Sequence, residues 1–172
     1  SVPASLAMAQ SRNTLEEIIV TAQKREETLQ DVPIAISALG ADSLAKQGIN
    51  NLKDFQGGQV PSLKVVQFAG RPNTIFLAIR GVAEPDPTQL TTERSVAVYV
   101  DNVYIARGNG MDTEVFDIDR IEVLRGPQGT LFGRSAEGGA LNITTRKPTG
   151  DFGFKQELEA SSLDEYKSRT LI

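Results

Sequence analysis

Short apolar stretches rich in β-branched residues recur along the chain between residues 32 and 145. Their lengths and the turn residues between them predict strands rather than long helices. We expect strands at residues 32–37, 63–68, 74–80, 96–100, 103–105, 115–124 and 140–145. Two short helices are expected, one at 40–48 that ends at Gly48 and one that begins after the capping residue Asn51. Many short strands with two small helices predict an α+β domain around a small mixed sheet.

Turn residues define the connections between these strands. Residues 69–73 predict a turn, and Asp101 with Asn102 predicts a tight hairpin because both residues tolerate positive φ. The densest glycine run lies within 121–143, with glycines at positions 126, 129, 133, 138 and 139. Glycine is favoured where the backbone takes positive φ or approaches another surface closely. The run therefore predicts a strand, a compact polar loop with a short helical turn, and a second strand.

The N-terminal region has a different character. Residues 1–15 are expected to be disordered, and the small residues Ala7 and Ala9 resemble the end of a secretory signal peptide, with an ordinary alanine-rich tail as the alternative. The following segment, Glu16–Ala22, is β-prone and has no visible partner within the tail. An isolated strand can add to the edge of another protein's sheet.

The C-terminal region alternates apolar and polar residues with a period of two. Phe152, Phe154 and Leu158 lie on one side of the pattern, and a turn at 162–165 leads to a second strand that begins at Tyr166. Such alternation is typical of the strands of a transmembrane barrel. It is equally compatible with an amphipathic hairpin that packs on the preceding domain.

Composition removes several classes of function. The chain has 172 residues, a net charge of −4, and neither cysteine nor histidine. The negative charge argues against nucleic-acid binding, and the missing residue types remove disulfides, thiolate metal sites and most catalytic triads. The glycine run lacks the Lys-Ser end of a phosphate-binding loop, which argues against nucleotide binding. Without histidine, cysteine or a recognisable pair of carboxylates, we do not expect an enzyme. The acidic residues at 112, 114, 117 and 119 favour a solvated loop over a weak cation site, so we expect neither a metal nor a cofactor.

Several motifs occur in an order that resembles TonB-dependent outer-membrane receptors. Glu16–Ala22 resembles the TonB box, the short segment of these receptors that the energy-transducing protein TonB binds. Further segments resemble parts of the plug, the domain that fills the receptor barrel. They are Asp31–Ile36, Ile79–Val82, Val98–Asp101, Val103–Tyr104, Phe116–Arg134 and Gly138–Asn142. Asn102 departs from the glycine usual in the family, and either residue suits the turn. Ser135–Glu137 differs only in a variable part of the loop.

The resemblance implies a division of the chain into four regions. These are a signal remnant and tail at 1–15, a TonB box and linker at 16–30, a plug domain at 31–147, and the start of a barrel domain at 152–172. Barrels of this family have about 22 strands, and this chain supplies at most two of them. We therefore expect a fragment of a longer receptor or a truncated gene product. The implied location is the outer membrane, with the plug inside the barrel lumen and the N-terminus in the periplasm.

The resemblance also implies roles for individual residues. TonB would bind Glu17, Ile18, Ile19, Val20, Thr21 and Ala22. Arg80 and Arg125 would lock the plug by pairing with glutamates of the barrel, whereas without the resemblance both would be ordinary surface arginines. Ligand would contact loops at 69–73, 83–94 and 107–113, through Arg71, Pro72, Asn73, Arg107 and Asn109.

The implied function is to gate the energy-dependent uptake of a small ligand such as a ferric siderophore. The implied partners are TonB, the receptor's own barrel, the ligand and the outer membrane, without nucleic acid. The alternative is an independent periplasmic domain that binds a ligand or acts as an adaptor.

Overall fold

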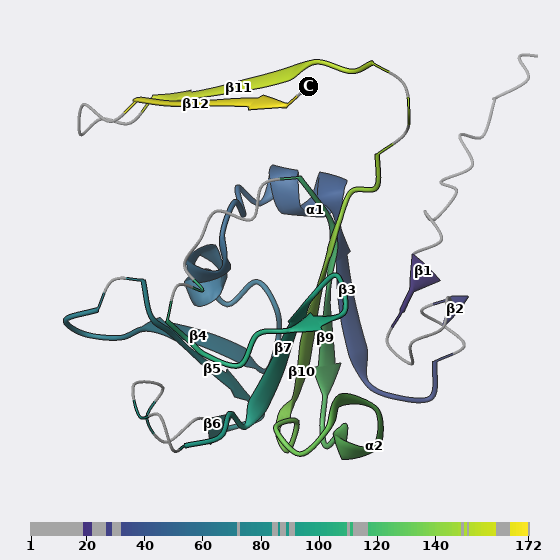
Figure 1. Ribbon diagram of the computed structural model, residues 1–172, viewed down its shortest axis with the longest axis vertical. Coiled ribbons are helices and arrows are strands. Elements are labelled where there is room, and N and C mark those ends of the chain that lie inside the picture. Colours follow the sequence, from purple (N-terminus) through teal and green to yellow (C-terminus); the bar gives the residue numbers. More distant parts are fainter. Residues whose placement is uncertain are drawn as a thin grey trace, which may run out of the picture.

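A mixed five-stranded sheet forms the centre of the molecule in the computed structural model (Figure 1). The structure describes residues 19–21, 27–28, 32–71, 73–83, 86, 89, 92–109, 111, 117–148, 150, 152–160 and 166–171. The strand order is β3 (Ile36–Gly40), β9 (Ile118–Arg125), β10 (Gly139–Thr145), β7 (Val96–Val100) and β8 (Val103–Tyr104). Only the β10–β7 pair is parallel. This architecture confirms the predicted α+β class.

A three-stranded antiparallel sheet and two short helices pack beside the central sheet. The smaller sheet consists of β4 (Leu63–Gln67), β5 (Ile75–Ile79) and β6 (Val82–Ala83), and the helices are α1 (Ala41–Lys46) and the 3₁₀ helix η1 (Leu52–Gly57). Asn51 is the N-cap of η1 as predicted, and it forms a capping box with Asp54, whose Oδ2 accepts from the Asn51 backbone N–H at 3.0 Å. Among the described residues, no helix has the length and apolar character needed to cross a membrane.

The tight turn and the glycine loop also follow the sequence-based predictions. Asp101 and Asn102 both have positive φ between β7 and β8. The loop from β9 to β10 contains a short helix, α2 (Gly129–Phe132). Gly139 begins β10 with φ +146°, and a Cβ placed there would lie 2.2 Å from the backbone oxygen of Leu124. Only glycine allows β9 and β10 to approach so closely at this point.

Two expectations about the N-terminal half are wrong. The strand expected at 32–37 begins only at Ile36, and Pro33 lies in a bend, because proline has no N–H to offer the sheet. The segment expected to lack a partner in the tail is paired there. Its described part, β1 (Ile19–Val20), forms an antiparallel pair with β2 (Glu27–Thr28).

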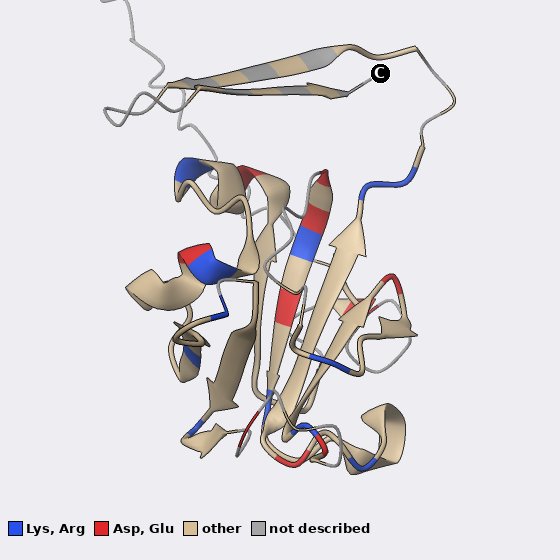
Figure 2. Ribbon diagram, turned by 60° about the vertical axis from the view of Figure 1, so that its left-hand side comes forward, with Lys and Arg blue, Asp and Glu red and all other residues tan. Residues whose placement is uncertain are grey.

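The two faces of the central sheet differ. On the first face, large apolar residues such as Ile121, Val123 and Leu141 form one core with residues of α1, η1, β4 and β5. The second face carries a smaller apolar cluster, in which Ala97 and Ala140 lie beside larger residues such as Leu124. Figure 2 shows acidic and basic residues along one central strand of a sheet that is otherwise almost uncharged, and β9 is that strand.

The C-terminal strands form the predicted hairpin. β11 (Lys155–Ala160) and β12 (Tyr166–Leu171) are antiparallel, with Lys155 opposite Leu171. Their predicted turn at 162–165 lies outside the described residues. Figure 1 shows the hairpin apart from the five-stranded and three-stranded sheets, and Phe154, Leu158 and Tyr166 are exposed. These apolar side chains are therefore not buried against the domain.

Candidate functional site

A buried carboxylate lies near the middle of the second face. Glu122 is on β9, and the strand register places it beside Asn142 of β10 and Ala38 of β3. Its exposed fraction is 0%. A buried charge is tolerated in a protein only when it is paired and hydrogen-bonded. The surroundings of Glu122 meet this requirement.

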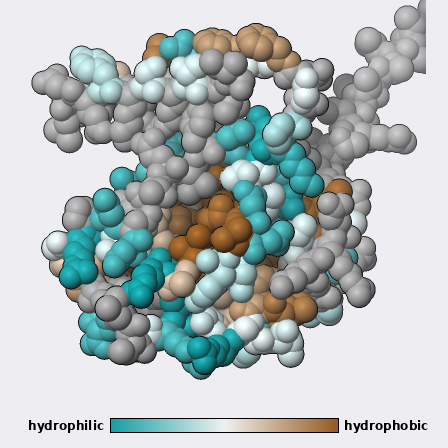
Figure 3. All heavy atoms as spheres, in the orientation of Figure 1, coloured by the Kyte–Doolittle hydropathy of each residue, from teal (hydrophilic) through white to brown (hydrophobic). Residues whose placement is uncertain are grey.

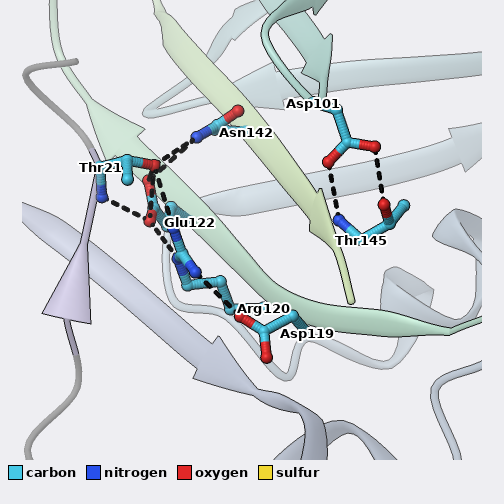
Figure 4. A network of polar contacts seen from close by, with 7 residues as sticks. All are labelled: Thr21, Asp101, Asp119, Arg120, Glu122, Asn142 and Thr145. Carbon is cyan, nitrogen blue, oxygen red and sulfur yellow. Dashed lines mark hydrogen bonds and ion pairs between the residues drawn. The ribbon is translucent and has the colours of Figure 1, made fainter. Parts of the chain in front are cut away.

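Arg120 and Asn142 hold the two oxygens of this carboxylate (Figure 4). Arg120 Nε donates to Glu122 Oε1 at 2.8 Å, and Asn142 Nδ2 donates to Oε2 at 3.2 Å. Arg120 Nη1 also donates to Asp119 Oδ2 at 2.8 Å. Burial lowers the pKa of Arg120, but hydrogen bonds and charge attraction from Glu122 and Asp119 more than offset this, so the pKa lies above its ordinary value.

The N-terminal segment joins the same network through Thr21. The backbone N–H of Thr21 donates to Glu122 Oε1 at 2.7 Å, and its hydroxyl lies 3.3 Å from the same oxygen. The hydroxyl also accepts from Asn142 Nδ2 at 3.1 Å and from Arg120 Nη2 at 3.3 Å. The segment is therefore fixed by polar contacts to two central strands.

Val20 adds an apolar contact to this docking. Its side chain is fully buried in the second-face cluster, which also contains Leu124, Phe132 and Ala140. Ile19, one position earlier, is 51% exposed. The predicted residues Glu17, Ile18 and Ala22 lie outside the described residues. The described part of the predicted TonB-binding segment is thus packed on the sheet and only partly accessible.

The two predicted locking arginines come from different sheets. Arg80 is exposed in the turn after β5, and its Nη1 lies 3.6 Å from the position that a Cβ on Gly126 would occupy. Arg125, next to Gly126, donates from Nη2 to the Ile36 carbonyl at 3.1 Å. The structure therefore brings Arg80 to the backbone beside Arg125. The buried Nε of Arg125 has no hydrogen-bond partner in the described part of the chain.

The residues that follow the predicted ligand loop at 69–73 contact the predicted ligand loop at 107–113. Thr74 Oγ1 donates to Asn109 Oδ1 at 3.0 Å, and the Ile75 N–H donates to the Gly108 carbonyl at 3.4 Å. Arg71, Asn73, Arg107 and Asn109 are all exposed. Pro72 lies outside the described residues, as do parts of the loops at 83–94 and 107–113. Figure 3 shows polar side chains over much of one face of the molecule, with a hydrophobic area near its centre.

Sequence reasoning missed the roles of Glu122 and Asn142. The available signal was a charged residue within the otherwise apolar run Ile121–Leu124. An open cavity of about 900 Å³, lined mostly by residues of polar type, adjoins the network, and its lining includes Thr21, Arg120 and Asn142. In the part of the chain that the structure describes, no group of three or more carboxylate, histidine or cysteine side chains could hold a metal ion. Asp112 and Glu114 of the acidic cluster lie outside that part.

Comparison with known proteins identifies the class. The family model of the TonB-dependent receptor plug domain matches residues 28–140, and the chain belongs to this family. The pesticin receptor of Yersinia pestis is 29% identical over 169 residues, which cover 98% of this chain and 24% of the receptor. The pesticin receptor of Yersinia enterocolitica is 31% identical over 161 residues, which cover 93% of this chain and 23% of the receptor. The chain spans about a quarter of the length of these relatives.

Solved structures agree with this assignment. The ferric yersiniabactin uptake receptor FyuA of Yersinia pestis matches with a TM-score of 0.64 and 29% identity, over 78% of this chain and 20% of that chain. The FpvAI–pyocin S2 complex matches with a TM-score of 0.69 and 24% identity, over 87% of this chain and 19% of that chain. At that identity, the second match shows the fold alone. The predicted plug fold is thereby confirmed.

Proposed function

We propose that this chain is the plug region of an outer-membrane receptor that gates the energy-dependent uptake of a small ligand. The observation that carries this proposal is the docking of Ile19–Thr21, part of the predicted TonB box, on the central sheet of a plug fold. A segment that is docked on its own domain in this way can be released and then bound by a partner. Relatives named as a ferric yersiniabactin uptake receptor and a ferripyoverdine receptor support a ferric siderophore as the ligand class.

TonB would bind the segment by adding a strand to it. β1 already pairs with β2, so the partner's strand must either displace β2 or use the other edge of β1. Because Val20 is buried and Thr21 is tied to Glu122, the second choice also requires the segment to leave the sheet. If TonB uses that other edge, its binding and the docking of Thr21 exclude each other.

Arg80 and Arg125 would lock the plug to the barrel. The exposed position of Arg80 supports a carboxylate partner outside the described residues, and the side chain of Arg125 is half-buried. The exposed apolar residues of β11 and β12 support their role as the first barrel strands, where such residues would face lipid.

The ligand would meet the plug at the loops that Thr74 and Asn109 join. Arg71 and Arg107 lie exposed in these loops and would attract an anionic iron chelate. The docked segment would extend into the periplasm, where TonB acts.

The proposal is tested by the binding of the periplasmic domain of TonB to the intact receptor. Ile19→Pro removes a backbone donor from the segment and fixes φ, so we expect binding to be lost. The matched control Ile19→Val keeps both the N–H and the β-branched side chain and should bind as the natural protein does. Calorimetry measures both affinities. Undiminished binding by Ile19→Pro would exclude this segment as the TonB site, and recovery of the protein outside the outer membrane would favour a periplasmic domain.

A further inference from the structure

We propose that Glu122 is the positioning residue of the TonB-binding segment, holding Thr21 on the second face and so keeping Val20 buried. The link to TonB rests on the proposed function, whereas the docking itself does not. Glu122 receives the shortest hydrogen bond of the network, 2.7 Å from the Thr21 N–H. A bond to an ionised acceptor in a buried setting is stronger than one between neutral groups.

The backbone contact makes the position specific. Because the donor is a backbone N–H, a different side chain at position 21 (other than proline) would keep it. The bond forms only when residue 21 lies opposite Glu122 along β9. Glu122 is 101 residues away in sequence from Thr21, and it projects from the middle of the strand rather than from its end. The contact therefore sets where Val20 enters the apolar cluster of Leu124, Phe132 and Ala140.

The network is arranged so that the segment can leave without stranding a charge. When Thr21 departs, Arg120 still donates to Oε1 and Asn142 still donates to Oε2. The adjoining cavity, which Thr21, Arg120 and Asn142 line, gives water access to the vacated positions. The free-energy cost of release is therefore limited to the loss of the Thr21 contacts and of the burial of Val20. A cost of this kind is compatible with reversible docking.

The test measures how often Val20 leaves its buried site in the intact protein. This chain has no cysteine, so Val20→Cys introduces one reporter thiol, with any cysteine elsewhere in the protein replaced by serine. The rate of maleimide labelling then reports opening of the segment. We expect Glu122→Gln, which keeps the shape and removes the charge, to raise this rate at least about tenfold, in line with the strength of charge-assisted bonds.

Two further variants separate positioning from a general effect on the fold. Thr21→Pro removes the N–H donor without altering the sheet and should raise labelling to a similar degree. Asp119 is the other carboxylate partner of Arg120, and its hydrogen bond in this network goes to Arg120 rather than to Thr21. Asp119→Asn should therefore leave the labelling rate within about twofold of that of the natural protein. Hydrogen exchange of β10 is followed in each variant and should not change.

The outcomes decide the proposal. Equal labelling in Glu122→Gln and the natural protein would overturn it. So would faster labelling in Glu122→Gln without faster labelling in Thr21→Pro, because Glu122 would then act only on the sheet. The assay contains neither TonB nor ligand. Loss of the TonB-binding result with the labelling result intact would therefore refute the proposed function and leave the positioning role standing.

Discussion

The central sheet is covered in two different ways on its two faces. The first face presents Ile121, Val123 and Leu141 to α1, η1, β4 and β5, which together form a continuous apolar core. On the second face, a buried polar network lies next to a smaller apolar cluster, and a short segment from the N-terminal region contributes Val20 to the cluster and Thr21 to the network. The same strands therefore support a large apolar core on one side and, on the other, a smaller apolar cluster next to a polar network.

The largest expected effect comes from the first face. Leu141→Ala should lower the free energy of opening of the sheet by about 2–5 kcal/mol, because it leaves a cavity in a well-packed core. Hydrogen exchange of β9 and β10 amides in the intact protein measures this loss. The control Val103→Ala removes a residue that is 64% exposed and should cost less than about 0.5 kcal/mol. If the two variants lowered the free energy of opening by similar amounts, the first face would not contain the stabilising core that this comparison requires.

A smaller and more local effect is expected on the second face. Val20→Ala should destabilise the docked segment by about 1–2 kcal/mol through lost apolar burial. Exchange of the Thr21 amide should become faster, while that of Leu141 should not change. If β9 and β10 lost protection to the same extent as Thr21, the two faces would behave as one cooperative unit.

The smallest effect is expected for an exposed ion pair whose length is close to the 2.8 Å of the buried Arg120–Glu122 pair. Arg134 Nη2 lies 2.9 Å from Glu93 Oε1, but the two side chains are 84% and 52% exposed. Arg134→Ala should change the stability of either face by no more than about 0.5 kcal/mol, because solvent screens such pairs. A measured effect as large as that of Glu122→Gln would show that burial does not distinguish the two pairs.

The pattern of apolar residues was sufficient to predict most of the fold. Strong β-branched runs such as Val96–Val100 left little ambiguity, and Asp101 with Asn102 specified its turn. The pairing of β1 with β2 could not be predicted, because two residues on each side give no periodic signal. Pro33 displaced the start of β3 for a reason visible in the sequence, its missing N–H.

The site was harder to predict than the fold. Glu122 alternates with apolar neighbours, as a solvent-facing residue of a half-covered strand would. One of its hydrogen-bond partners, Thr21, lies about a hundred residues earlier in the chain, which local pattern cannot reveal. Arg80 and Arg125 were selected through family resemblance, and the structure adds the proximity of Arg80 to the backbone beside Arg125.

Native-state hydrogen exchange of the intact protein tests the central claim most directly. The claim is that the N-terminal segment opens from the second face while the first-face core stays closed. We predict that the Thr21 amide exchanges at least about tenfold faster than the amides of Val123 and Leu141, through an opening that depends little on denaturant. Equal rates, with the same denaturant dependence for all three amides, would contradict the account.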